Sequence, residues 1–141
     1  MVGLETKGTE TADESIDGPI FCPVEITLGV MGGKYKPLLL YYIEANEVLR
    51  FGQLRHLVSS ASKKMLTQQL RELEADGLIR RKVYKVVPPK VEYSLTERGK
   101  SLQPVLREMG RWGASHARYY RKSIGHWQHK VDSELASGCS R

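Results

Sequence analysis

The stretch 62–77, SKKMLTQQLRELEADG, limits what this chain can fold into more than any other segment. Leu66, Leu70 and Leu73 recur at spacings of four and three residues, which places them on one face of an amphipathic helix. Ser62 stands where a helix N-cap belongs, and Gly77 stands where a helix ends. The sequence therefore predicts a helix that buries a leucine face.

The opposite face of this helix is cationic and amide-bearing over its first turns, and the acidic residues come only in the last turns. Lysine and arginine bind phosphates or guanine edges in the DNA major groove, and glutamine can bind adenine. Two interpretations stay open for the helix alone, a DNA recognition helix or a surface helix with a charged face. The side chains on this face are Lys64, Thr67, Gln68 and Arg71.

The neighbouring segments favour DNA recognition. Residues 52–58 predict a short helix with Leu54 and Leu57 inward, and a turn of small residues then leads to Ser62. Two helices joined in this way are typical of a helix-turn-helix. Residues 78–83 and 91–95 alternate like β-strands, and the loop between them, YKVVPPK, has two prolines and a lysine near each end. This order predicts a winged helix, an α+β fold that is mostly helical.

The rest of the chain predicts helices on both sides of this unit. Pro23 begins a short apolar helix, and residues 34–46 form a buried central helix that Asn46 ends in a left-handed conformation. Residues 49–51 resemble a very short strand. Thr96 caps the last helical region, and Pro104 restarts it near Ser101.

The last predicted helix carries a narrow apolar seam of coiled-coil type, with spacings of three and four residues. No other segment is long enough to cover it, so we expect homodimerisation through residues 101–122, with the Cys22 helix alongside. The alternative is that the seam packs onto the core of its own domain. The seam residues are Leu102, Val105, Met109, Trp112, His116 and Tyr119.

Charge is unevenly distributed along the 141 residues, which are enough for one domain. Residues 1–21 contain one lysine and five acids, whereas the remainder has a net charge of +10. We expect a disordered acidic tail over residues 1–19, a basic folded domain over 20–122 that has a polyanionic partner, and a tail over 123–141, either partly helical or trailing in solvent.

Targeting features are missing from the sequence. The start, MVGLETKGTE, has no apolar signal region, and no run approaches the roughly 20 apolar residues of a membrane span. We therefore expect a cytoplasmic protein without a membrane partner, in which both cysteines are reduced.

Cys22 is a candidate reactive thiol because it would cap the helix that starts at Pro23. The positive end of a helix stabilises a thiolate. The alternative is a small, half-buried residue at a helix start. His126, His129 and Cys139 have a poor spacing for zinc, so we expect no metal ion. Nothing resembles a catalytic constellation, so we expect neither an enzyme nor a cofactor.

Several motifs together resemble the HxlR-type winged-helix transcriptional regulators, relatives of the MarR family. The resemblance extends from Cys22 to about Trp112. Tyr35 stands where tryptophan is commoner, and Ser60-Ala61-Ser62 replaces a Gly-Ile-Ser turn. The motifs are CPVE (22–25), GGKY (32–35), RF (50–51), KMLTQQLREL (64–73), DGL (76–78), VPPKVEYSLT (87–96) and RWG (111–113).

The resemblance implies a dimeric repressor or activator that binds an inverted repeat in double-stranded DNA. It implies that the 62–76 helix enters the major groove and that the wing, residues 85–90, touches flanking backbone or the minor groove. Lys64, Thr67, Gln68 and Arg71 are then candidates for base edges, next to Ser62 at the N-cap. The candidates for phosphates are Lys63, Arg81, Lys85 and Lys90.

Regulation is also implied by the resemblance. Several members sense oxidants, quinones or aldehydes at the position of Cys22, and some pair it with a C-terminal cysteine of the partner chain, for which Cys139 is the candidate. The effector is then an oxidant or another small molecule. The rival function is a winged-helix protein-interaction module with only non-specific DNA affinity, because a fold does not determine a function.

Overall fold

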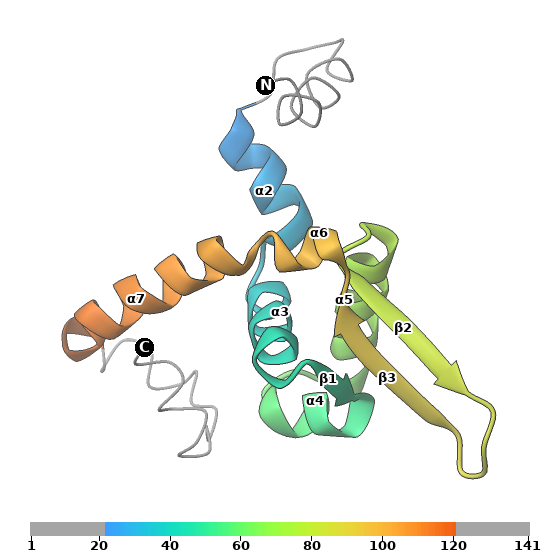
Figure 1. Cartoon of the computed structure of the whole chain (residues 1–141). Coiled ribbons are helices and arrows are strands. Elements are labelled where there is room, and N and C mark those ends of the chain that lie inside the picture. Colours follow the sequence, from blue (N-terminus) through green and yellow to red (C-terminus); the bar gives the residue numbers. More distant parts are fainter. Residues whose placement is uncertain (1–21, 121–141) are drawn as a thin grey trace, which may run out of the picture.

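The computed structural model of the chain describes residues 22–120, which form a mostly helical domain with a small antiparallel sheet (Figure 1). The sheet has the strand order β1 (Val48–Arg50), β3 (Lys90–Leu95), β2 (Ile79–Tyr84). Helices and strands follow the order expected of a winged helix, so the predicted fold class is confirmed. The elements are α2 Pro23–Met31, α3 Tyr35–Asn46, β1 Val48–Arg50, α4 Phe51–Leu57, α5 Lys63–Ala75, β2 Ile79–Tyr84, β3 Lys90–Leu95, α6 Glu97–Lys100 and α7 Gln103–Tyr120.

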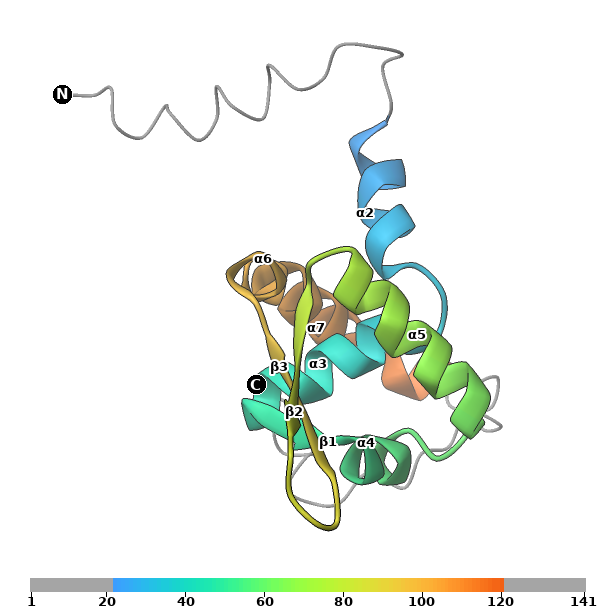
Figure 2. The same cartoon turned by 90° about the vertical axis from the view of Figure 1, so that its right-hand side faces the viewer.

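The core surrounds α3, as its nearly continuous apolar sequence predicts. Leu39, Leu40 and Ile43 are completely buried. Helix α5 packs against α3 through its leucine face, and the sheet closes the other side of α3 (Figure 2). Each buried leucine contributes about 1.5–3 kcal/mol relative to an exposed one, so α3 and α5 together hold the domain in shape.

The hairpin β2–β3 is the wing, and each of its strands reaches one residue further toward the loop than the sequence predicted. Tyr84 pairs with Lys90, so both residues belong to strands, and only residues 85–89 form the loop. The outer strand β1 pairs with β3 in the register Leu49 to Tyr93. The alternation along β3 buries Tyr93 and Leu95 toward the core.

Helices begin and end close to where the sequence predicted, because capping residues stand at their termini. Ser62 and Thr96 cap α5 and α6 through their side-chain oxygens. Gly77 follows α5 with φ +75°, a left-handed conformation that glycine adopts at no steric cost. The prediction for Asn46 was wrong: its amide donates to the Tyr42 carbonyl inside α3, and Glu47 has the positive φ instead.

Helices α2 and α7 extend away from the body of the domain (Figure 1). Met31, at the end of α2, is buried in the core, whereas Cys22 at its start is exposed. Pro104 lies in the first turn of α7, and a short turn separates this helix from α6, as predicted. Within residues 22–120, no helix is both long and apolar enough to cross a membrane.

Candidate nucleic-acid interface

Helix α5 presents its polar face to solvent because its leucines bind it to the core. Ser62 Oγ accepts the backbone N–H of Met65 at 3.0 Å, which fixes the start of the helix. Leu66, Leu70 and Leu73 are buried, as predicted. The side chains of Lys64, Gln68 and Arg71 are consequently exposed together on the opposite face.

Thr67 is already engaged within α5. Its hydroxyl donates to the backbone carbonyl of Lys63 at 2.8 Å, and its side chain is half-buried. A base contact by this hydroxyl would require a new rotamer or a shared hydrogen bond.

A groove of about 430 Å³ separates α5 from the wing. Three cations line it, Lys63 and Arg71 from the helix and Arg81 from β2, while Glu74 is the acid on the same wall. The sequence placed Arg71 among the base contacts, but its position here equally suits a phosphate. The floor is formed by apolar and aromatic residues, Phe51, Leu70, Val91 and Tyr93.

The two wing lysines named from the sequence differ in their surroundings. Lys85 is exposed in the loop. Lys90 lies in β3, where its ammonium is 3.4 Å from the Glu92 carboxylate and 4.6 Å from the centre of the Tyr84 ring. The Tyr84 hydroxyl donates to Glu92 at 2.9 Å, and with Lys90 and Arg50 it lowers the pKa of that carboxyl. Lys90 is therefore already engaged by an ion pair and a ring contact within the wing.

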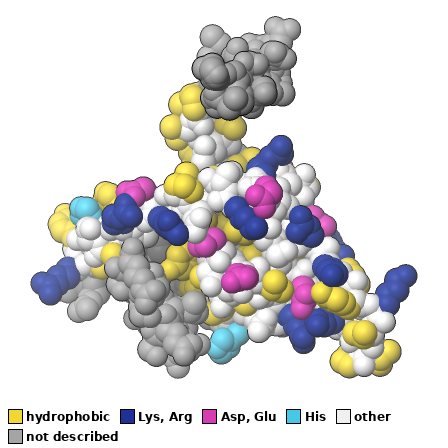
Figure 3. All heavy atoms as spheres, in the orientation of Figure 1, with side chains coloured by type: hydrophobic (Ala, Val, Ile, Leu, Met, Phe, Trp, Pro, Cys, Tyr) yellow, Lys and Arg dark blue, Asp and Glu magenta, His cyan; other side chains and the backbone are white. Residues whose placement is uncertain are grey.

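Further cations lie on the face of the wing that points away from the groove, which also carries Lys90, and the sequence did not identify them as DNA contacts. Arg80 and Lys82 alternate with Arg81 along β2, so they point to the opposite face of the hairpin. Arg50 joins them from β1, opposite Glu92. Ile79 is buried, and side chains alternate along the strand, so Arg81 shares the face of Ile79 whereas Arg80 and Lys82 lie on the other face. Figure 3 shows lysine and arginine side chains over the sheet.

The α7 seam is exposed beyond its first residue. Leu102 is half-buried against the core, and Leu106, which was not predicted, is fully packed there. His116 is exposed and stacks on Trp112 with 4.1 Å between ring centroids. The exposed apolar residues of this helix that form the α7 seam are Val105, Met109, Trp112 and Tyr119.

Helix α2 adds a second apolar surface, because Val24, Ile26 and Leu28 are exposed (Figure 3). Cys22 is the N-cap of this helix, and its thiol is exposed rather than half-buried. Cys139 and the tails at 1–19 and 123–141 lie outside the described residues. Within residues 22–120, no three metal-ligating side chains gather in one place.

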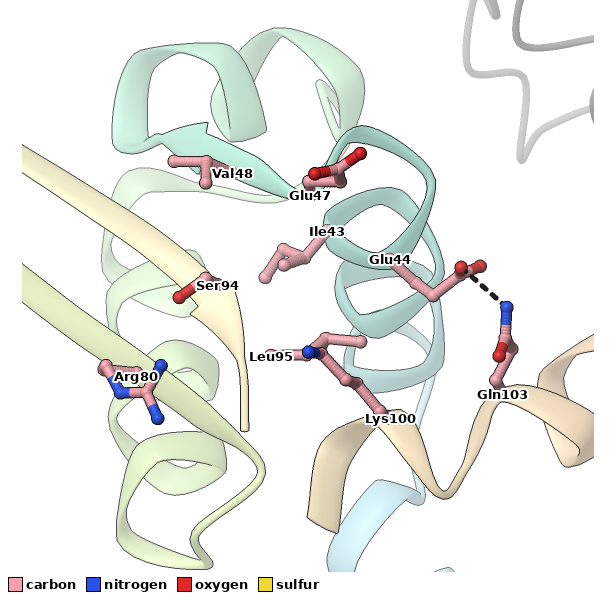
Figure 4. A pocket seen from close by; sticks show the side chains of 9 residues that line it. All are labelled: Ile43, Glu44, Glu47, Val48, Arg80, Ser94, Leu95, Lys100 and Gln103. Atoms are coloured by element: carbon pink, nitrogen blue, oxygen red, sulfur yellow. Dashed lines mark hydrogen bonds between the residues drawn. The ribbon is translucent and has the colours of Figure 1, made fainter. Parts of the chain in front are cut away.

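A cleft of about 450 Å³ lies where α7 leaves the domain (Figure 4). Glu44 of α3 accepts a hydrogen bond from the Gln103 amide at 2.8 Å, which fixes the start of α7 to the central helix. Arg80 and Lys100 line the same cleft from β2 and α6. Because α3 also packs against α5, this hydrogen bond helps to fix the start of α7 relative to α5.

Comparison with known proteins identifies the group to which the chain belongs. Residues 30–120 match the model of the HxlR-like helix-turn-helix family. The HTH-type transcriptional regulator YybR of Bacillus subtilis is 53% identical over 95 residues, which cover 67% of this chain and 75% of YybR. The chain belongs to the HxlR family. It is thus a transcriptional regulator of the HxlR and MarR type.

Solved structures of relatives include a redox regulator in two states. The oxidised form of HypR is 53% identical, with a TM-score of 0.64, and the match covers 67% of this chain and 96% of HypR. The reduced form is 48% identical, with a TM-score of 0.67, and the match covers 72% of this chain and 99% of HypR. These similarities confirm the resemblance inferred from the motifs and show that this HxlR-family chain is similar in sequence and fold to a redox regulator.

Proposed function

We propose that this protein is a sequence-specific DNA-binding regulator that acts as a homodimer on an inverted repeat. The observation that carries the proposal is the groove between α5 and the wing, where Lys63, Arg71 and Arg81 converge. A DNA backbone strand that follows this groove places the exposed face of α5 in the major groove. Cations then bind phosphates, while Lys64 and Gln68 lie toward base edges.

A second copy of the chain is the partner that the apolar surfaces favour. The α7 seam and α2 expose large apolar side chains that a monomeric domain would bury. A two-fold axis through these helices presents two α5 helices on one side of the dimer. Half-sites about 34–36 Å apart, one turn of B-DNA, would then be matched by the two helices.

The first experiment is a fluorescence-anisotropy titration of the reduced protein with DNA from upstream of its own gene. Scrambled DNA of the same length and composition is the control. We expect tight binding to the upstream fragment and weaker, strongly salt-dependent binding to the scrambled one. Equal affinity for both fragments would contradict the proposal and favour a protein-interaction module.

We propose further that Cys22 is the thiol through which oxidants alter DNA binding. Its thiol is exposed at the N-terminus of α2, and HypR, a relative in sequence and fold, is a redox regulator. Two thiols that form a disulfide give up two electrons and two protons to the oxidant. Cys139 of the partner subunit is the candidate second thiol.

The connection from α2 to the DNA-binding body is short. Met31 is buried in the core, and Gly33, with φ +93°, leads directly into α3. A movement of α2 would therefore displace the central helix α3. This displacement would change the angle between the DNA-binding domains of the two protomers. A coupling of about 1–3 kcal/mol would change affinity about 5- to 150-fold.

The thiol proposal is tested by repeating the titration after mild oxidation, with Cys22→Ser and Cys139→Ser as matched variants. We expect the wild type to change affinity and Cys22→Ser to remain constant. Loss of the response in Cys139→Ser as well would support the disulfide. A Cys22→Ser protein that responds like the wild type would exclude Cys22 as the sensor and favour another effector.

A further inference from the structure

Three polar side chains form a chain of contacts from the core to the exposed face of α5. Lys36, on α3, is only 7% exposed, and its ammonium lies 2.6 Å from one carboxylate oxygen of Glu72. The other oxygen of Glu72 accepts a hydrogen bond from the Gln68 side-chain amide at 2.8 Å. Gln68 lies one turn earlier on α5. Its side chain is therefore hydrogen-bonded to Glu72, which is itself paired with Lys36 of α3.

From this chain of contacts, we propose that Glu72 is a positioning residue that orients Gln68 and makes it selective for adenine. The inference rests on the DNA-binding function proposed above. An ionised carboxylate only accepts hydrogen bonds, so only the NH₂ end of the Gln68 amide can face it. The amide oxygen of Gln68 must then point away from Glu72.

The neighbours of Glu72 favour its ionised form. The hydrogen bond from the Lys36 ammonium is the largest cause that lowers the pKa of Glu72, and the hydrogen bond from Gln68 is the next. A protonated carboxyl could donate a hydrogen bond and accept the opposite amide orientation. A glutamine without this partner can rotate its amide by half a turn and present either end.

The fixed orientation has a consequence for base recognition. Gln68 offers an acceptor oxygen and one remaining N–H donor. Adenine presents an N6 donor beside an N7 acceptor in the major groove, which matches this pair. Guanine presents two acceptors, O6 and N7, so the amide oxygen would face a guanine oxygen without a proton between them. The contact to Glu72 therefore favours adenine and disfavours guanine at one base pair in each half-site.

The test uses selection from a random-sequence DNA duplex library with the full-length reduced protein. The wild type defines the preferred bases, and Gln68→Ala identifies the position that Gln68 recognises. In Glu72→Gln, the new amide can donate to Gln68 and allow the opposite orientation. Preference for adenine over guanine at that position should then fall by about fivefold or more, the lower end of what one bidentate contact discriminates.

Two matched variants separate orientation from charge and from packing. Glu74→Gln removes the same charge from the same helix on the wing side, so it should raise affinity for all sequences alike and keep the adenine preference. Lys36→Met breaks the contact between α3 and α5 but leaves Glu72 ionised near neutral pH, so it should also retain most of the preference. Thermal unfolding verifies that each variant is folded.

Each outcome has a separate meaning. Loss of adenine preference in Glu72→Gln alone supports the proposal. Equal loss in Lys36→Met would overturn it and attribute the effect to the placement of α5. An unchanged preference in Glu72→Gln, when Gln68→Ala has lost it, would overturn the role of Glu72 while the DNA-binding function stands. A wild type that selects no sequence would overturn both.

Discussion

The replacement Trp112→Ala should dissociate the proposed dimer, and the structure indicates by how much. Trp112 is 57% exposed in the single chain and lies in the middle of the α7 seam. A buried tryptophan removes roughly 150–250 Å² from water, so the exposed share of Trp112 corresponds to about 85–140 Å² per protomer. Hydrophobic burial at about 25 cal/mol per Å² gives about 2–3.5 kcal/mol per protomer.

Two-fold symmetry doubles this contribution, since each protomer contributes the same side chain. The lower end is about 4 kcal/mol per dimer, which corresponds to a rise of about a thousandfold in the dissociation constant. Alanine also favours the helix more than tryptophan does, so α7 itself should remain helical.

Sedimentation equilibrium over a range of protein concentrations measures the dissociation constant directly. Arg107→Ala is the matched control, because residue 107 lies about 200° around α7 from Val105, on the opposite side of the helix. Thermal unfolding and circular dichroism establish whether the variant is still folded. A folded Trp112→Ala protein that dimerises as tightly as the wild type would refute the assignment of the seam as the interface.

Three further predictions concern the wing, an ion pair and a close backbone contact. Lys85→Ala should weaken binding to all DNA sequences alike and reduce the slope of log affinity against log salt by about one unit per site, with Lys100→Ala on α6 unchanged. Because the pKa of Glu72 is lowered, its ionised form stabilises the fold above the ordinary carboxyl pKa, and this contribution disappears as pH falls through the lowered value. The difference in Tm between wild type and Glu72→Gln should therefore narrow on acidification, and a difference independent of pH would contradict this. A Cβ at Gly99 would overlap the Leu78 carbonyl oxygen, so Gly99→Ala should destabilise by about 1–3 kcal/mol in denaturant unfolding, whereas Gly52→Ala, with open space around it, should not.

Helix and strand positions were predictable because their patterns are contained in short segments. The leucine spacing between Leu66 and Leu73, the caps at Ser62 and Thr96 and the alternation along the wing each depend on residues less than about ten positions apart. Boundaries were less predictable: Tyr84 and Lys90 belong to the strands because they pair across the hairpin, and alternation along one strand does not show where the pairing ends.

The candidate interface was predictable as a set of residues but not as an arrangement. The cationic face of α5 follows from helical periodicity, and its exposure is confirmed. Lys90, by contrast, was expected in the loop at the DNA, and its engagement with Glu92 and Tyr84 required the fold. The groove that brings Lys63, Arg71 and Arg81 together likewise requires α5 and β2 to lie side by side.

By itself, the sequence determined the helix-turn-helix, the hairpin, the apolar seam and the family, because periodicity, capping and motif spacing act locally along the chain. The tertiary structure alone decided which polar groups meet. Lys36 and Glu72 are far apart along the chain, and Glu44 and Gln103 are further apart still, yet each pair is in contact. Their contacts depend on how α3 packs against α5 and α7, and that packing is a property of the whole core rather than of any one segment.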